Sequence, residues 1–357
     1  MANLDNFSAI RALDKENHLA NIQDMPEQVE TTWADFKNQG LPTLFVNAKS
    51  VLILGMGGSA QGGGIVASMA QNQSSIPIFV LRDYDIPGWV DKNTLVIAVS
   101  YSGETEEVIS AFTAAAKKTD KLITISTGGR IYSLGTQHKA FHYRVRYGAQ
   151  PRAAMGVLLT AVLAIFSKLK IIEIFDDDVK EAVLLMRSLK KKIDVEVPER
   201  RNPAKVLAKS LVGRFPIVYG SGNLAEVARR IKGQFNESSK TVSFFEVLPE
   251  LNHNSLAGLV FPEDIRQKLF FLILESKYDH ERNKLRQSIV AQIFEQKKLS
   301  YETINIEPAG NPFSEVMQVI LFADYTSYYL AMLNNVAPDP VEIVEFLKGK
   351  LAEKPLD

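Results

Sequence analysis

The chain has 357 residues, 41 basic and 41 acidic side chains, a formal net charge of +0 and no cysteine. This length favours two domains over a single core. The balanced charge argues against a nucleic-acid-binding protein, and the lack of cysteine excludes disulfides, thiolate nucleophiles and zinc fingers. We therefore expect the partners to be small molecules or a second copy of the chain.

Hydropathy favours a soluble protein. Residues 1–17 are mixed and polar, with no apolar segment of the kind that forms a secretory signal. The strongest apolar stretch that we identify, residues 157–166, is too short to span a bilayer and is typical of a buried helix. We expect a cytoplasmic protein that binds neither membranes nor nucleic acid.

In the first half of the chain, an N-terminal helical segment precedes an alternation of strands and helices. Residues 1–45 show helical spacing of apolar side chains, and the segment ends at residues 40–42 (GLP). Short apolar runs that predict buried strands then alternate with helical patterns, at residues 51–54, 76–81, 94–99 and 121–126. Such alternation predicts βαβ units and a mainly parallel sheet covered by helices on both faces.

The pattern restarts in the second half. A long helical stretch from residue 151 to about residue 192 separates the halves. Further strands are predicted at residues 215–219, 242–247, 268–274 and 300–306, and the chain ends in helices. We therefore predict an α/β protein of two tandem, related α/β/α domains: an N-terminal helical segment (1–45), a first domain with a trailing helix (46–195) and a second domain with C-terminal helices (196–357).

Glycines follow the first predicted strand. Residues 55–60 (GMGGSA) match the dinucleotide-binding pattern G-x-G-x-x-[GA] between a strand and a helix. A tight strand-to-helix turn recruits glycine for steric reasons as well, and Asp83 lies beyond the spacing expected of a ribose-binding acid. Residues 62–64 (GGG) would weaken a helix, so they indicate close backbone contact with a ligand or with a packed neighbour.

A hydroxyl-rich loop, residues 100–105 (SYSGET), follows the strand predicted at residues 94–99 and opens a helix. Ser100, Ser102 and Thr105, with the free N–H groups of a helix N-terminus, form a cradle suited to phosphate. The alternative is an ordinary N-cap with incidental serines, although a cap requires only one hydroxyl. We call residues 100–105 the hydroxyl loop. Glu104 places an unexpected negative charge in it.

Short motifs follow one another in a fixed order along the chain. The first half contains residues 57–59 (GGS), 100–105 (SYSGET), 126–129 (STGG) and 150–156 (QPRAAMG). The second half contains residues 219–222 (YGSG), 232–237 (KGQFNE) and 250–254 (ELNHN). Each motif alone is modest, but the ordered set is specific: it resembles the bifunctional phosphoglucose/phosphomannose isomerases, a branch of the phosphoglucose isomerase superfamily built from two sugar-isomerase (SIS) domains.

The resemblance implies interconversion of aldose and ketose 6-phosphates through a cis-enediol, without metal or cofactor. By motif match Glu237 would be the base, and Arg152 would stabilise the enediolate. His253 would help to open the sugar ring from the neighbouring subunit, which implies a homodimer. Lys348 would assist ring opening, although Lys350 lies on the same segment. Taken without the family, these four residues are a helix-end glutamate, a surface arginine, a structural histidine and a helix-end lysine.

The phosphate ligands implied by the resemblance are Gly58, Ser59, Ser100, Ser102 and Thr105. Two positions depart from the family pattern: Glu104 stands where relatives often have asparagine, and Asp339 precedes Pro340 where many have threonine. The expected substrates are glucose 6-phosphate and mannose 6-phosphate, with fructose 6-phosphate as product. The competing hypotheses are a non-catalytic SIS-domain sugar-phosphate sensor and, from residues 55–60 alone, a nicotinamide dehydrogenase.

Overall fold

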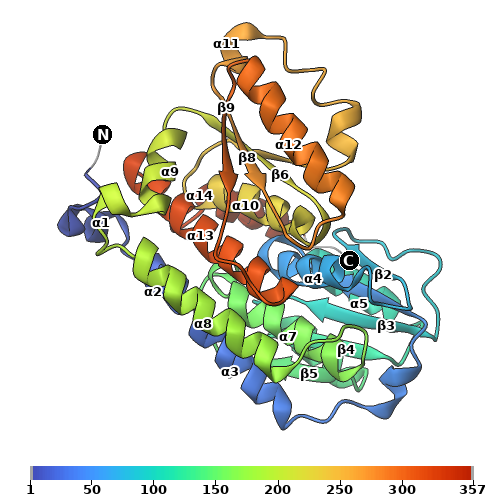
Figure 1. Cartoon of the computed structure of the whole chain (residues 1–357). Helices are drawn as coiled ribbons and strands as arrows, with labels where there is room; N and C mark the ends of the chain where they lie inside the picture. The colour runs from blue at the N-terminus through green and yellow to red at the C-terminus, as the bar shows by residue number, and fades with distance from the viewer. Residues whose placement is uncertain (1–2, 355–357) are drawn as a thin grey trace.

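Two parallel β-sheets, each flanked by helices, make up the protein (Figure 1). The structure is a computed structural model that describes residues 3–354. The first sheet has the strand order β2-β1-β3-β4-β5 and the second has the order β7-β6-β8-β9, with every pairing parallel. The strands are β1 (Ser50–Leu54), β2 (Ile78–Leu81), β3 (Thr94–Val99), β4 (Leu122–Ser126), β5 (Phe141–Arg144), β6 (Phe215–Gly220), β7 (Phe244–Val247), β8 (Leu269–Leu274) and β9 (Ser300–Ile304).

Helices cover both sheets and join them. Those before β6 are α1 (Phe7–Leu13), α2 (His18–Gln23), α3 (Met25–Lys37), α4 (Gly57–Ala70), α5 (Glu106–Ala115), α6 (Gly129–Gln137), α7 (Met155–Lys168), α8 (Asp176–Ile193) and α9 (Pro203–Leu211). Those after β6 are α10 (Ala225–Glu237), α11 (Glu263–Arg266), α12 (Glu281–Gln296), α13 (Pro312–Leu333) and α14 (Glu342–Ala352). Short 3₁₀ helices are η1 (Thr43–Asn47), η2 (Pro151–Ala153), η3 (Glu199–Arg201), η4 (Gly222–Leu224) and η5 (Glu250–His253).

The core contains a strand and a helix that are buried along almost their whole length. Every residue of β3 is buried, as expected for a central parallel strand covered on both faces. Helix α13 is long and apolar enough to cross a membrane by length and composition, but its apolar window is 100% buried inside the protein. It packs against α8, α9 and α10 and is therefore a core helix.

Helix α4 lies between the two halves, and its glycines permit that position. A Cβ on Gly62 would lie 2.9 Å from the backbone nitrogen of Leu159 in α7. A Cβ on Gly64 would lie 2.7 Å from Oε2 of Glu226 in α10. The glycines at residues 62–64 therefore serve close packing against neighbouring elements, which decides between the two alternatives drawn from the sequence.

The predicted fold class is confirmed, and the predicted strands are present with shifts of up to two residues at their ends. Strand β5 and helix α6 were not predicted. The sequence of β5 gives little signal because it is a short, partly polar edge strand. The single helical stretch predicted from residue 151 to about residue 192 is wrong in detail: it consists of η2, α7 and α8, with a break between Lys168 and Asp176. The proposed domain boundaries stay a prediction.

Candidate active site

The hydroxyl loop connects β3 to α5. Ser100 is fully buried, and its Oγ lies 2.8 Å from Oγ1 of Thr105 and accepts a hydrogen bond from the Gly103 nitrogen at 3.2 Å. Ser102 is exposed and accepts from the Glu104 nitrogen at 3.3 Å. Thr105 is the N-cap residue of α5, but its side chain makes no capping hydrogen bond. An ordinary N-cap therefore does not account for the three hydroxyls, and the first turn of α5 keeps N–H groups for an anion.

The start of α4 lies beside the hydroxyl loop because β1 and β3 are adjacent parallel strands. Ser59 is buried, and its Oγ accepts a hydrogen bond from the Tyr101 nitrogen at 3.1 Å. A Cβ on Gly58 would lie 3.1 Å from the backbone nitrogen of Arg152, so only glycine lets η2 approach so closely. The five candidate phosphate residues thus gather at the carboxyl ends of β1 and β3, where parallel sheets bind ligands.

Glu104 does not point its charge at this cradle. Its Oε1 accepts a hydrogen bond from the backbone nitrogen of Arg130 at 2.9 Å, in the first turn of α6. A carboxylate in that place is favoured by the free N–H groups and the positive end of the helix dipole. The unexpected negative charge is thus compensated by α6.

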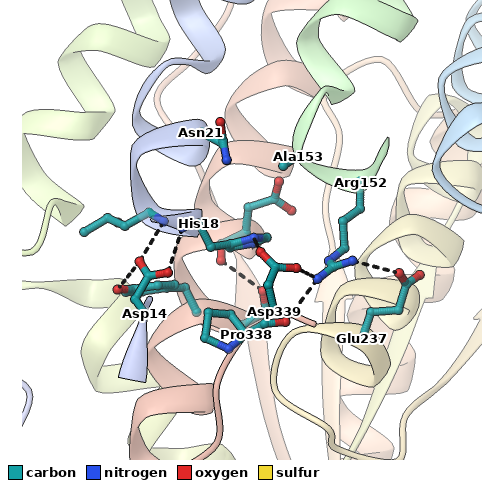
Figure 2. Close-up of polar contacts among 12 residues, drawn as sticks. Asp14, His18, Asn21, Arg152, Ala153, Glu237, Pro338 and Asp339 are labelled. Carbon is teal, nitrogen blue, oxygen red and sulfur yellow. Dashed lines mark hydrogen bonds and ion pairs between the residues drawn. The ribbon is translucent and has the colours of Figure 1, made fainter. Parts of the chain in front are cut away.

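Arg152 and Glu237 come from the two halves of the chain and meet beside α4. Arg152 lies in η2 and is only 5% exposed, so it is not a surface arginine. Its Nη1 lies 3.7 Å from Oε2 of Glu237, the last residue of α10 (Figure 2). Arg152 also forms an ion pair with Asp339, and its Nη2 donates to the Pro338 carbonyl at 3.1 Å. Two carboxylates therefore flank one guanidinium.

Two further cations surround this pair. Lys240 donates to the backbone carbonyls of Glu237 at 2.7 Å and of Pro338 at 2.9 Å. Loss of hydration, followed by repulsion from Arg152, lowers the pKa of Lys240 to about 8. Arg230 is fully buried; its Nη2 donates to the Arg152 carbonyl at 3.1 Å and lies 2.8 Å from a carboxylate oxygen of Asp324.

His253 in η5 and Lys348 in α14 are both exposed. Within residues 3–354, neither side chain makes a hydrogen bond or ion pair with Arg152 or Glu237. Lys350 pairs with Glu353 at 2.7 Å. The chain by itself thus brings together the residues expected to bind phosphate, the base and the enediolate stabiliser, but not the two ring-opening residues.

The asparagines beside His253 bond elsewhere. Asn252 accepts from Arg286 at 3.2 Å, and Asn254 donates to Glu250 at 3.2 Å. Within residues 3–354, neither asparagine side chain forms a hydrogen bond with the His253 ring.

Sequence reasoning missed His18. This residue of α2 is fully buried, and its Nδ1 lies 2.6 Å from Oδ2 of Asp339, the residue that pairs with Arg152 (Figure 2). Asp339 was noted only as a departure from the family pattern. No motif marks His18, because the contact joins positions 321 residues apart.

The two parallel sheets, with a hydroxyl loop at one carboxyl edge and a buried arginine facing a carboxylate, define a sugar-isomerase (SIS) protein. The bacterial phospho-glucose isomerase C-terminal SIS domain matches residues 200–351. The chain belongs to the family of bifunctional phosphoglucose/phosphomannose isomerases. It is 37% identical over 335 residues to the member from Caldicellulosiruptor bescii, and the alignment covers 93% of this chain and 98% of the relative.

Other comparisons agree. The bifunctional phosphoglucose/phosphomannose isomerase of Aquifex aeolicus is 30% identical over 332 residues, covering 92% of this chain and 99% of the relative. Among solved structures, a hypothetical protein from Thermus thermophilus superposes with a TM-score of 0.71 at 16% identity, covering 96% of this chain and 93% of that one. The structural likeness supports the fold alone.

Proposed function

We propose that this protein is an isomerase that converts glucose 6-phosphate and mannose 6-phosphate to fructose 6-phosphate through a cis-enediol. The observation that carries the proposal is the buried guanidinium of Arg152 3.7 Å from the Glu237 carboxylate, next to an anion cradle. An aldose–ketose isomerisation needs one base that moves a proton between two adjacent carbons and one fixed cation at the oxygen that becomes negative. The names of the relatives support this chemistry.

Each group then has a role. The hydroxyl loop with Gly58 and Ser59 binds the phosphate and thereby fixes the far end of the open-chain sugar. Glu237 removes the proton from C2 of the aldose and returns it to C1. Arg152 stabilises the enediolate oxygen, and Lys240, which donates to the backbone carbonyl of Glu237, adds positive charge nearby. The proposed reaction uses no metal or cofactor, so a chelator should leave the rate unchanged.

Ring opening is proposed to require a homodimer. His253 is exposed in the single chain, so we assign it to the active site of the partner subunit, while Lys348 assists from α14. Mixing Glu237→Gln and His253→Gln subunits tests this arrangement. A hybrid dimer has one intact site if that site is built from both chains, so random reassortment should restore about a quarter of wild-type activity. We place this enzyme in the cytoplasm, in glycolysis and gluconeogenesis.

The decisive experiment compares initial rates for both aldose phosphates and for fructose 6-phosphate in wild type and Glu237→Gln. Glu281→Gln is a matched control, because Glu281 is exposed and, among the described residues, forms an ion pair with Lys284 alone, at 2.9 Å. We expect Glu237→Gln to lower kcat by about 10³-fold with KM nearly unchanged, because the carboxylate acts as the base rather than in binding.

No conversion by the wild type would overturn the proposal. Binding of hexose 6-phosphate without turnover would indicate the alternative, a non-catalytic SIS-domain sugar-phosphate-binding protein. Glu237 favours the enzyme, because a sensor has no need of a carboxylate beside a buried arginine.

A further inference from the structure

The side chain of Arg152 is held by a chain of contacts that begins in the N-terminal helices. His18 Nδ1 lies 2.6 Å from Oδ2 of Asp339, and Oδ1 of Asp339 pairs with Nη2 of Arg152. Figure 2 shows Asp339 between His18 and Arg152, with Glu237 on the other side of the guanidinium. All three side chains are buried: the exposed fraction is 0% for His18, 6% for Asp339 and 5% for Arg152. Because water does not reach these polar groups, the loss of one contact would leave a buried group without a partner.

The His18 ring acts as a neutral donor. Complete burial, followed by repulsion from Arg152, lowers the pKa of His18 to about 4. A neutral imidazole that faces a carboxylate through Nδ1 carries its proton on that nitrogen. His18 therefore orients the Asp339 carboxylate without adding a charge to the site.

The backbone around Arg152 is held by the same N-terminal segment. The side-chain amide of Gln28 in α3 donates to the Ala153 carbonyl at 2.9 Å and accepts from the Gly156 nitrogen at 3.0 Å. Helix α2 is itself fixed at its start, because Asp14 accepts from the His18 nitrogen at 2.7 Å and from the Tyr328 hydroxyl at 2.9 Å. The N-terminal segment thus holds Arg152 through both its backbone and its side chain.

We propose that His18 and Asp339 are positioning residues of the active site: His18 orients Asp339, and Asp339 holds the Arg152 guanidinium so that its other nitrogen faces Glu237. Asp339 also shares the positive charge, so Glu237 is not the only counter-ion of Arg152. This inference rests on the proposed isomerase function.

The charged and titratable groups around Arg152 come from several elements. They are His18 of α2, Arg230 and Glu237 of α10, Lys240, Asp324 of α13, Asp339, and Glu342 and Glu345 of α14. Within residues 3–354, Asp339 and Glu237 are the carboxylates that form an ion pair with its guanidinium, so the removal of one changes the electrostatic environment of the other.

The test measures kcat, KM and the inhibition constant of inorganic phosphate for four variants. Asp339→Asn should lower kcat by about 10–100-fold, because the stabilising guanidinium is misplaced, while the inhibition constant of inorganic phosphate stays within twofold of the wild-type value. His18→Leu should lower kcat by about 10-fold, and His18→Asn, whose amide can donate in place of Nδ1, should recover most of that loss.

Asp176→Asn is the matched control, because Asp176 forms an exposed ion pair with Lys37 at 2.7 Å, and its kcat should stay within about twofold of wild type. Equal rates for His18→Asn and His18→Leu would overturn the proposal, as would an unchanged kcat in Asp339→Asn. If the wild type itself does not isomerise hexose 6-phosphates, the proposed function fails first. If the wild type is active and Asp339→Asn matches it, only the positioning role fails.

Discussion

The burial of His18 predicts how the free energy of unfolding depends on pH, independently of catalysis. Its pKa is lowered from 6.5 to about 4 in the folded chain, so between these values the unfolded chain binds a proton that the folded chain does not. By linkage, this group's contribution is fully present above pH 6.5 and is lost as the pH falls towards 4. At pH 4.5 the loss amounts to roughly 2–3 kcal/mol, from about 1.36 kcal/mol per pKa unit.

The variant His18→Asn removes the titrating ring but keeps a donor for Asp339. We expect it to be less stable than wild type at about pH 7.5, because the smaller side chain leaves a gap in the buried site. As the pH falls to about 4.5, the difference in free energy of unfolding should shift by roughly 2–3 kcal/mol in favour of the variant. Urea unfolding at fixed protein concentration, at half-unit steps of pH, measures this difference. Parallel loss of stability in both proteins would refute the reasoning, since other acidic groups affect both equally.

Three further changes test packing, the buried ion pair and the phosphate cradle. Gly62→Ala should lower the free energy of unfolding by about 2 kcal/mol, because the new Cβ would lie 2.9 Å from a backbone atom of Leu159; Gly88→Ala, with open space around it, is the control. Asp324→Ala should cost about 3–5 kcal/mol in urea unfolding, because it leaves Arg230 buried without its carboxylate. Ser102→Ala should raise KM for hexose 6-phosphates by about fivefold with kcat nearly unchanged, since the hydroxyl binds ground and transition states alike; an unchanged KM contradicts its assignment.

The parallel strands could be predicted because they are short apolar runs, and a strand buried on both faces needs no polar alternation. Strand β3, with all six residues buried, is the clearest case. The edge strand β5 (Phe141–Arg144) has one buried residue and an exposed arginine, so its pattern does not differ from that of a loop. Burial at an edge depends on neighbours that the local sequence does not contain.

Some residues of the candidate site could be predicted from local sequence motifs and others could not. Arg152, Glu237 and the hydroxyl loop are carried by local motifs, and the structure places them around α4. The partnership of His18 with Asp339 has no local signal, because it depends on how an N-terminal helix packs against the far end of the chain. A lone histidine does not reveal from the local sequence whether it is buried.

The arrangement of charge explains why these contacts suit the proposed reaction. Arg230 is balanced by Asp324, and Asp339 pairs with one end of the Arg152 guanidinium, so the other end remains for Glu237. When Glu237 accepts a proton, its negative charge moves to the enediolate, and the total charge of the site does not change. A guanidinium held beside the base stabilises the charge before and after this transfer without moving. The N-terminal segment fixes Arg152 in place. The guanidinium therefore does not have to reorient during the reaction, as a mobile cation would.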